Sequence, residues 1–392
     1  MKRIDTGKGY ITLWALLGIW SVSALTSLPG LAISPISEKL LHVFPSATDL
    51  DIQLLTTLPS LFIIPFILLA GFISERVGYI KLLYIGLVIF LLSGALYFFC
   101  TTMTQLIVVS VLLGVGAGVI IPLSTALISR FFVGDERTRQ YGYVSAITNI
   151  SLVVATTVAG WLADIQWRLP FVVYLLPLVS IMLVPAIRRG EVAQHADKDE
   201  HAALSGKISY LPLSKYMSYY LLITYLVMVF SINLPFLLGK EGYDSAVSGA
   251  VLSVFFLAMM LPGLFLKRIL DVVKGRVLQF SLLLILLGVA DIYMNRSVGF
   301  VIIGCIAAGV GYGVAQPYIY DVTASLATGG KVTSALALLM SMNYVAIVIS
   351  PFVVEYLQDI TGMKDEGSPF LINAVIAFFA LLFVTAYKHF VK

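Results

Sequence analysis

The sequence predicts an all-α membrane protein of twelve transmembrane helices, arranged as two six-helix halves. Three observations predict this fold class: the composition, the length of the apolar runs and the placement of the basic residues. Of the 392 residues, 59% are hydrophobic and 12% are charged, and the mean hydropathy is +0.98. Soluble domains carry about 25% charged residues and cannot hide so much apolar surface, which favours lipid as the solvent.

The spans follow from continuous apolar runs, because a helix needs roughly 20 apolar residues to cross about 30 Å of hydrocarbon. The runs do not alternate as the strands of a membrane barrel would, so each one predicts a helix. The first run resembles a signal peptide after a basic start, but eleven further runs favour a first transmembrane helix. The predicted spans are 11–36, 52–74, 79–100, 105–129, 141–163, 169–187, 216–239, 245–266, 277–295, 298–326, 333–358 and 368–388.

Basic residues set the predicted orientation, because cytoplasmic loops of membrane proteins are rich in Lys and Arg. With the N-terminus inside, 20 of the 25 basic residues fall in cytoplasmic segments. The five outer ones are Lys39, Arg168, Lys240, Arg296 and Lys364. We therefore expect a multi-pass protein of the cell (cytoplasmic) membrane with both termini in the cytoplasm.

The longest polar stretch divides the chain, since it follows six spans and precedes six more. We predict an N-terminal half at 1–187, a flexible cytoplasmic linker at 188–215 and a C-terminal half at 216–392. A metal site formed by His195 and His201 in the linker is the alternative reading. Their spacing fits no firm ligand motif, so we expect no metal.

The two halves repeat a pattern of glycines. Three glycines at alternate positions precede a proline in the fourth span, and the same pattern returns 195 residues later in the tenth. The first copy is Gly114, Gly116, Gly118 and Pro122, and the second is Gly309, Gly311, Gly313 and Pro317. An offset of about half the chain indicates duplication. Inside apolar helices such glycines allow close helix contact and are no nucleotide fingerprint.

The loop between the second and third spans reads GFISERVGYIK from Gly71 to Lys81. It resembles the signature loop of the major facilitator superfamily, although its basic residue comes late, at Lys81. The resemblance implies the twelve-helix fold, transport by alternating access, and a gating role for Gly71, Glu75, Arg76, Gly78 and Lys81. In the family the counterpart of Glu75 faces the N-terminus of helix 11, here near Thr333 and Ser334, where an anion is favoured. Ordinary positive-inside charge is the alternative for the basic residues.

Motifs of drug–proton antiporters are present only in eroded form. The stretch 134–142, which contains Arg137, resembles their loop between helices 4 and 5. Ser110 stands where these antiporters often carry Arg, and the fifth span keeps small residues but lacks their proline. The pattern is nearest to twelve-helix bacterial drug or metabolite exporters, and it weakens assignment to the drug antiporters themselves.

Polar residues inside the spans are candidates for a substrate cavity. No Lys or Arg falls deep inside a predicted span, which argues against strongly anionic substrates because a buried anion needs a partner. Neutral polar and aromatic side chains suit bulky amphiphilic ligands instead. The candidates are Trp20, Asn149, Asn233, Tyr312, Gln316 and Asn343. Their alternative roles are lipid contact, packing and hydrogen bonds between helices.

Asp321 is the predicted coupling residue. Most other acids lie in loops or near span ends, whereas Asp321 follows Pro317 in the tenth span and the apolar run continues beyond it. An intramembrane carboxylate is costly while charged, which favours reversible protonation. Its partner is expected on another helix. If the helix ends near Tyr320, Asp321 is instead an ordinary interfacial residue.

These features predict a secondary active transporter that exports amphiphilic or drug-like compounds in exchange for protons, as a multidrug antiporter does. The alternatives are proton-coupled uptake of a neutral or weakly charged metabolite, and lipid flipping. An enzyme is not expected, because the spans contain no paired acids, histidine cluster or activated nucleophile. The expected partners are a small-molecule substrate, protons and the bilayer, without nucleic acid or cofactor, and we expect a monomer.

Overall fold

The computed structural model describes residues 3–29, 40, 43–45, 49–188, 206–243, 245–363 and 365–390. Within these residues, eleven helices are long and apolar enough to cross a membrane, and a shorter apolar helical stretch, Leu13–Ser27, precedes them. Each predicted span thus has a helical counterpart, which confirms the all-α class. The proposed linker histidines, His195 and His201, lie outside the described residues.

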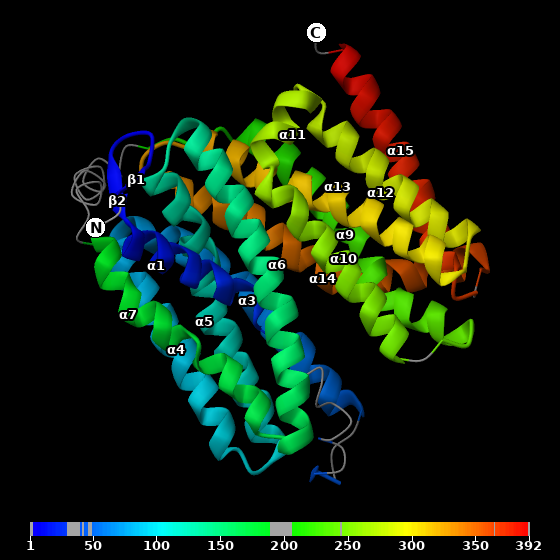
Figure 1. The fold of residues 1–392 in the computed structure, drawn as a ribbon, viewed down its shortest axis with the longest axis horizontal. Coiled ribbons are helices and arrows are strands. Elements are labelled where there is room, and N and C mark those ends of the chain that lie inside the picture. Colours follow the sequence, from blue (N-terminus) through cyan, green and yellow to red (C-terminus); the bar gives the residue numbers. More distant parts are fainter. Residues whose placement is uncertain are drawn as a thin grey trace. The chain divides into compact units, whose positions relative to one another are not determined.

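The elements follow in chain order (Figure 1). The first part contains β1 (Arg3–Asp5), β2 (Tyr10–Thr12), α1 (Leu13–Ala24), the 3-10 helix η1 (Leu25–Ser27), α3 (Asp49–Val77), α4 (Tyr79–Leu96), η3 (Tyr97–Phe99), α5 (Met103–Phe131), α6 (Gly134–Ile165), η4 (Leu169–Leu175) and α7 (Pro177–Arg188). The second part contains α9 (Tyr210–Lys240), α10 (Ser245–Leu264), α11 (Leu266–Val273), α12 (Val277–Met294), α13 (Val298–Ser325), α14 (Lys331–Thr361) and α15 (Ser368–Phe390).

Local sequence explains where several helices begin. The Thr12 hydroxyl accepts a hydrogen bond from Ala15 N at 3.2 Å and caps α1. At the start of α5, Thr102 and Gln105 cap each other's backbone N–H groups, each at 3.3 Å. Such caps supply partners for backbone groups that a helix end leaves open. Between α3 and α4, Gly78 has a φ of 83°, so the chain turns where glycine carries no steric cost.

The glycines of α5 lie at close helix contacts. A Cβ added to Gly114 would lie 2.6 Å from the carbonyl oxygen of Pro59 in α3. One added to Gly116 would lie 2.7 Å from the backbone nitrogen of Phe90 in α4. Neither site has room for a side chain, so these glycines let three helices pack backbone to backbone.

The repeated glycines of α13 make the corresponding contacts. A Cβ on Gly309 would lie 2.8 Å from the carbonyl oxygen of Phe255 in α10, and one on Gly311 would lie 2.8 Å from that of Ser281 in α12. In both copies the first glycine meets one membrane-spanning helix, and the middle glycine meets the next membrane-spanning helix along the chain. The shared packing supports the duplication that the sequence predicts.

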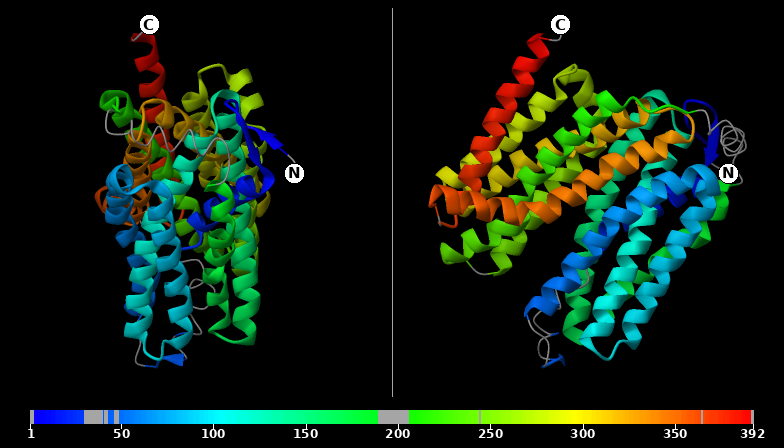
Figure 2. Two further views of the ribbon diagram at one scale, coloured as in Figure 1. Left: turned by 90° about the vertical axis from the view of Figure 1, so that its left-hand side faces the viewer. Right: turned by 180° about the vertical axis from the view of Figure 1, so that it is seen from behind.

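The chain forms two compact units. Unit 1 contains residues 1–217 and 320–344, and unit 2 contains 218–319 and 345–392. In unit 1, α1 packs on α7 and α5 packs on α3 and α4. In unit 2, α15 runs beside α12 (Figure 2). Segment 320–344 comprises the end of α13 and the first half of α14, and its Ala324, Ala337 and Met340 share a hydrophobic core with the N-terminal helices. The division into halves at 187 and 215 stays a prediction.

Candidate functional site: a helix contact and a latch within unit 1

A close contact joins α3 to the start of α14, at the glycine that opens the signature-like loop. The Ser334 hydroxyl donates a hydrogen bond to Gly71 O at 2.9 Å, and both residues are buried. A Cβ on Gly71 would lie 2.6 Å from Ala337 Cβ and 3.2 Å from Ser334 Cα. Only glycine permits this approach, so Gly71 sets the distance between the two helices. We call the packing of Gly71 on Ser334 and Ala337 the gate contact.

The other residues of the loop differ in placement. Gly78 caps α4, and the side chains of Arg76 and Lys81 are exposed. The side chain of Glu75 lies outside what the structure describes, although its backbone belongs to α3. The gating roles of all five residues therefore stay predictions. Gly71 lies beside the helix start that the family resemblance indicates.

Asp321 forms an ion pair with the first turns of α6. Arg137 Nε lies 2.6 Å from Asp321 Oδ1, and the Thr138 hydroxyl lies 2.5 Å from Oδ2. The charged side chains are largely buried, with 22% of Arg137 and 15% of Asp321 exposed. Helix α13 continues to Ser325, so Asp321 lies within the helix, as the coupling hypothesis requires. We call Arg137, Thr138 and Asp321 the latch.

The latch shows that α6 supplies the partner of Asp321, which the local sequence did not indicate. Its two sides are 184 residues apart in the chain, and no spacing rule relates them. The ring of Tyr141, one turn after Arg137, packs edge-on against the ring of Tyr320, the residue before Asp321, with the ring centroids 6.4 Å apart. Charge-assisted hydrogen bonds are stronger than neutral ones, and losing one partner leaves the other charge partly buried and unpaired.

Two candidate cavity residues of the N-terminal half lie on α1 and α6. Trp20 Nε1 donates to Gln140 Oε1 at 3.1 Å, and the Trp20 ring packs edge-on against Tyr143 at 6.3 Å. The Asn149 amide donates to a carbonyl of its own helix, Ser145 O, at 2.8 Å. Trp20 and Asn149 are both half-buried. The structure does not join their side chains to each other, and the packing alternative stands beside the cavity reading.

In unit 2, two other candidates form one network of neutral polar groups. Gln316 Nε2 donates to Tyr220 OH at 3.1 Å and to Tyr312 OH at 3.4 Å. The Tyr312 hydroxyl also lies 3.4 Å from the Thr224 hydroxyl. Sequence reasoning missed Tyr220 and Thr224. A signal existed, because each pair, 220 with 224 on α9 and 312 with 316 on α13, has the four-residue spacing of one helix face.

The two other candidates are Asn233 and Asn343. Asn233 is half-buried in α9 within unit 2, and Asn343 is half-buried in α14 within unit 1. Their assignment to a substrate cavity stays a prediction.

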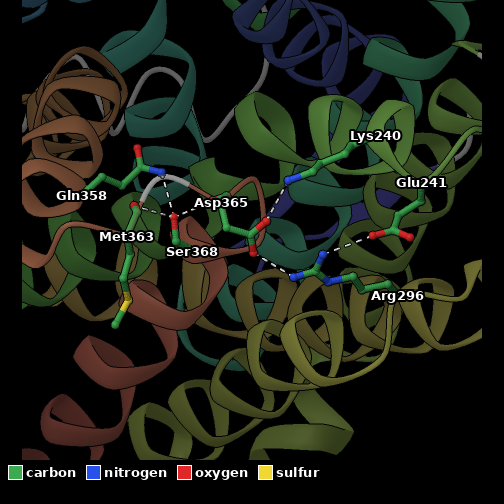
Figure 3. Close-up of polar contacts among 7 residues, drawn as sticks. All are labelled: Lys240, Glu241, Arg296, Gln358, Met363, Asp365 and Ser368. Carbon is green, nitrogen blue, oxygen red and sulfur yellow. Dashed lines mark hydrogen bonds and ion pairs between the residues drawn. The ribbon is translucent and has the colours of Figure 1, made fainter.

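A second charged cluster ties three loops of unit 2 together (Figure 3). Asp365 binds Lys240 at 3.0 Å and Arg296 at 2.8 Å, and Arg296 also binds Glu241 at 3.2 Å. The hydrogen bond from Lys240 and the nearby Arg296 guanidinium lower the pKa of Asp365. The hydrogen bond between Arg296 and Glu241 raises the pKa of Arg296. A carboxyl group whose pKa is lowered on folding stabilises the folded state above its unfolded pKa of about 4. This stabilisation is lost as the pH falls through the lower pKa of the folded state. The cluster therefore holds across the neutral range.

This cluster contains two of the five basic residues that are predicted to lie on the outer side. Lys240 and Arg296 are paired with acids there, and Arg168 donates to Cys100 O at 3.1 Å and lies 4.6 Å above the Trp167 ring. Lys39 and Lys364 lie outside the described residues. Local partners thus account for three of the five exceptions to the charge rule.

The apolar helices, their glycine repeat and the gate contact define a class: a polytopic membrane protein built by internal duplication. The sequence matches the Major Facilitator Superfamily over residues 15–351 and 216–389. The chain therefore belongs to this family, whose members are membrane transporters. The fold class and the resemblance predicted from the signature-like loop are confirmed.

Relatives and solved structures agree with this assignment. "Multidrug transporter protein MdtP" of Bacillus subtilis (strain 168) is 32% identical over 123 residues, which are 31% of this chain and 22% of that protein. "Quinolone resistance protein NorA" of Staphylococcus aureus (strain Mu50 / ATCC 700699) is 28% identical over 127 residues, 32% of each chain. The matched stretch thus spans less than a third of either relative.

Two solved structures share the fold over nearly the whole chain. The proton:xylose symporter XylE, bound to 6-bromo-6-deoxy-D-glucose, superposes with a TM-score of 0.76 at 13% identity, covering 95% of both chains. The human organic anion transporter MFSD10 superposes with a TM-score of 0.70 at 16% identity, covering 94% of this chain and 97% of that one. At these identities the likeness concerns the fold alone.

Proposed function

We propose that the protein exports amphiphilic or drug-like small molecules across the cell membrane by alternating access, in exchange for protons. The gate contact carries this proposal. It joins α3 to α14, elements from the two sides of the duplication, at the end of the molecule that the charge distribution assigns to the cytoplasm. A solute can enter from the cytoplasm only when this contact opens, and it can leave to the outside only when the contact is closed.

The latch gives the gate a means of control. While Asp321 is ionised, its contact with Arg137 at 2.6 Å stabilises the closed arrangement. A proton taken up by the carboxylate would remove the charge that holds Arg137 and favour opening. An interaction made in only one of two states shifts their populations by its full free energy. In this proposal Asp321 couples proton movement to the gate.

The substrate class is inferred from the polar groups within the helices. The network of Tyr220, Thr224, Tyr312 and Gln316 offers hydroxyl and amide groups without formal charge. Such groups orient a neutral or amphiphilic molecule without the cost of an unpaired buried charge. The names of MdtP and NorA favour drug-like compounds. The same network also favours a second candidate, uptake of a neutral hydroxylated metabolite.

Accumulation of a panel of fluorescent dyes and antibiotics tests the export proposal. We expect cells with the protein to accumulate less of at least one amphiphilic compound than cells without it. An uncoupler should abolish the difference, because the proton gradient drives the exchange. Energised uptake of a neutral metabolite, with no dye efflux, would support the second candidate and contradict export.

The orientation belongs to the same proposal and has its own test. Single cysteines at Thr102 and Asn295, in a background without Cys100 and Cys305, should react with a membrane-impermeant maleimide added to intact cells. A cysteine at Lys198 in the linker should react only after the membrane is opened. The prediction follows from the placement of 20 basic residues on one side. Labelling at 198 but not at 102 in intact cells would reverse the topology.

A further inference from the structure

The N-terminal β-hairpin lies outside the transport machinery described so far. Strands β1 and β2 pair antiparallel, with Ile4 opposite Ile11, and residues 6–9 form the connecting loop. Thr6 closes this loop, because its backbone N and its hydroxyl both donate to Gly9 O at 2.9 Å. Thr6 is fully buried, although the surrounding sequence is polar. A buried loop residue requires a neighbour, and here the neighbour is the turn between α5 and α6.

The hairpin docks on the residue that precedes α6. Val133 N donates a hydrogen bond to Thr6 O at 3.0 Å. Gly7, with a φ of 81°, packs so closely that a Cβ would lie 2.8 Å from Val133 O and 2.9 Å from Val133 Cγ2. Val133 is the N-cap residue of α6, and its own side chain makes no capping hydrogen bond. The hairpin therefore contacts a helix start whose N-cap side chain supplies no partner for the open backbone N–H groups.

The first turns of α6 carry the latch. Arg137 and Thr138 follow Val133 by four and five residues, and both bind Asp321. We infer that the N-terminal hairpin positions the latch: by fixing Val133 it sets where Arg137 and Thr138 meet Asp321. The inference rests on the proposed function in one respect, that the latch stabilises the closed gate. It assigns a role in transport to residues 3–12.

A buried cysteine reports gate opening without a transport assay. Thr333 is fully buried beside Gly71, and its hydroxyl has no hydrogen-bond partner among the described residues. In purified protein with Cys100 and Cys305 replaced by alanine, Thr333→Cys should react slowly with a maleimide while the gate is closed. Gly71→Val serves as the positive control, since it forces α14 away from α3 and should expose the thiol.

Gly7→Ala is the test variant, because its added methyl group meets Val133. We expect the labelling rate at position 333 to rise about fivefold, which corresponds to about 1 kcal/mol in the closed–open equilibrium. The matched control is Gly242→Ala, where φ is 86° and no described atom lies within 4 Å of the added methyl group. It imposes the same backbone strain in unit 2 and should leave the rate unchanged. Thr6→Val, which removes the hydroxyl bonds of the loop, should act in the same direction.

A double-mutant cycle separates positioning of the latch from a general effect on folding. In an Asp321→Asn background the latch is already broken, so Gly7→Ala should add no further increase in labelling. An undiminished increase in that background would overturn the inference, as would no increase from either Gly7→Ala or Thr6→Val while Gly71→Val still exposes position 333. Failure of dye export with an intact labelling pattern would count against the proposed substrate and leave the hairpin's role in place.

Discussion

Gly71→Val should abolish transport while leaving the protein folded in the membrane. The substituted Cβ would lie 2.6 Å from Ala337 Cβ, well inside van der Waals contact, and the neighbouring backbone of Ser334 lies at 3.2 Å. Forcing extra atoms into a packed contact costs about 1–3 kcal/mol. In the proposed cycle only the closed state makes this contact, so the population of that state should fall by about 5- to 150-fold relative to the open state. Energised efflux, normalised to the amount of protein in the membrane, measures the effect.

Gly160→Val is the matched control for this prediction. Gly160 also lies within a long transmembrane helix, α6, but no described atom lies within 4 Å of an added Cβ. The two variants share the intrinsic effect of replacing a helical glycine by a β-branched residue. We expect Gly160→Val to transport normally. Normal efflux by Gly71→Val at normal expression would show that the α3–α14 contact is not needed for the transport cycle.

Asp321→Asn should abolish proton-driven concentrative transport while sparing exchange of substrate down its gradient. The substitution keeps the size of the side chain but removes the charge that binds Arg137 at 2.6 Å. An exposed ion pair contributes up to about 1 kcal/mol, whereas loss of one partner of a fully buried pair costs about 3–5 kcal/mol. The latch is largely buried, so its loss should fall between these limits and weaken gate closure. Efflux at several external pH values, compared with counterflow in vesicles, separates the two activities.

The exchanged pair, Arg137→Asp with Asp321→Arg, distinguishes a latch from a coupling site. The double variant restores opposite charges across α6 and α13, so the closed gate should recover, as measured by protection of a cysteine at position 333. We expect concentrative transport to stay lost, because the carboxylate that we propose as the coupling group has moved off α13. Full recovery of pH-dependent concentrative transport would assign the pair to gating alone and place proton coupling elsewhere in the protein.

Much of the architecture was determined by the sequence itself. Lipid leaves no water to satisfy backbone groups, so a continuous apolar run of about twenty residues must be a helix. For that reason the predicted spans agree with the helices to within a few residues at most boundaries, as with 277–295 and α12 (Val277–Met294). The glycine repeat can also be read from the sequence, and in both copies its glycines allow close packing of neighbouring helices.

Tertiary structure alone decided the partners. Arg137 is one basic residue among several in its stretch, and nothing in its spacing pairs it with Asp321, because the pairing depends on how α6 and α13 are rotated and packed. The hairpin was not predicted for a related reason: two three-residue strands show too little alternation to indicate a sheet, and their stability depends on docking against Val133. Hydropathy determines which segments enter the membrane, whereas the contacts of Asp321 and Val133 depend on which surfaces of the folded elements meet.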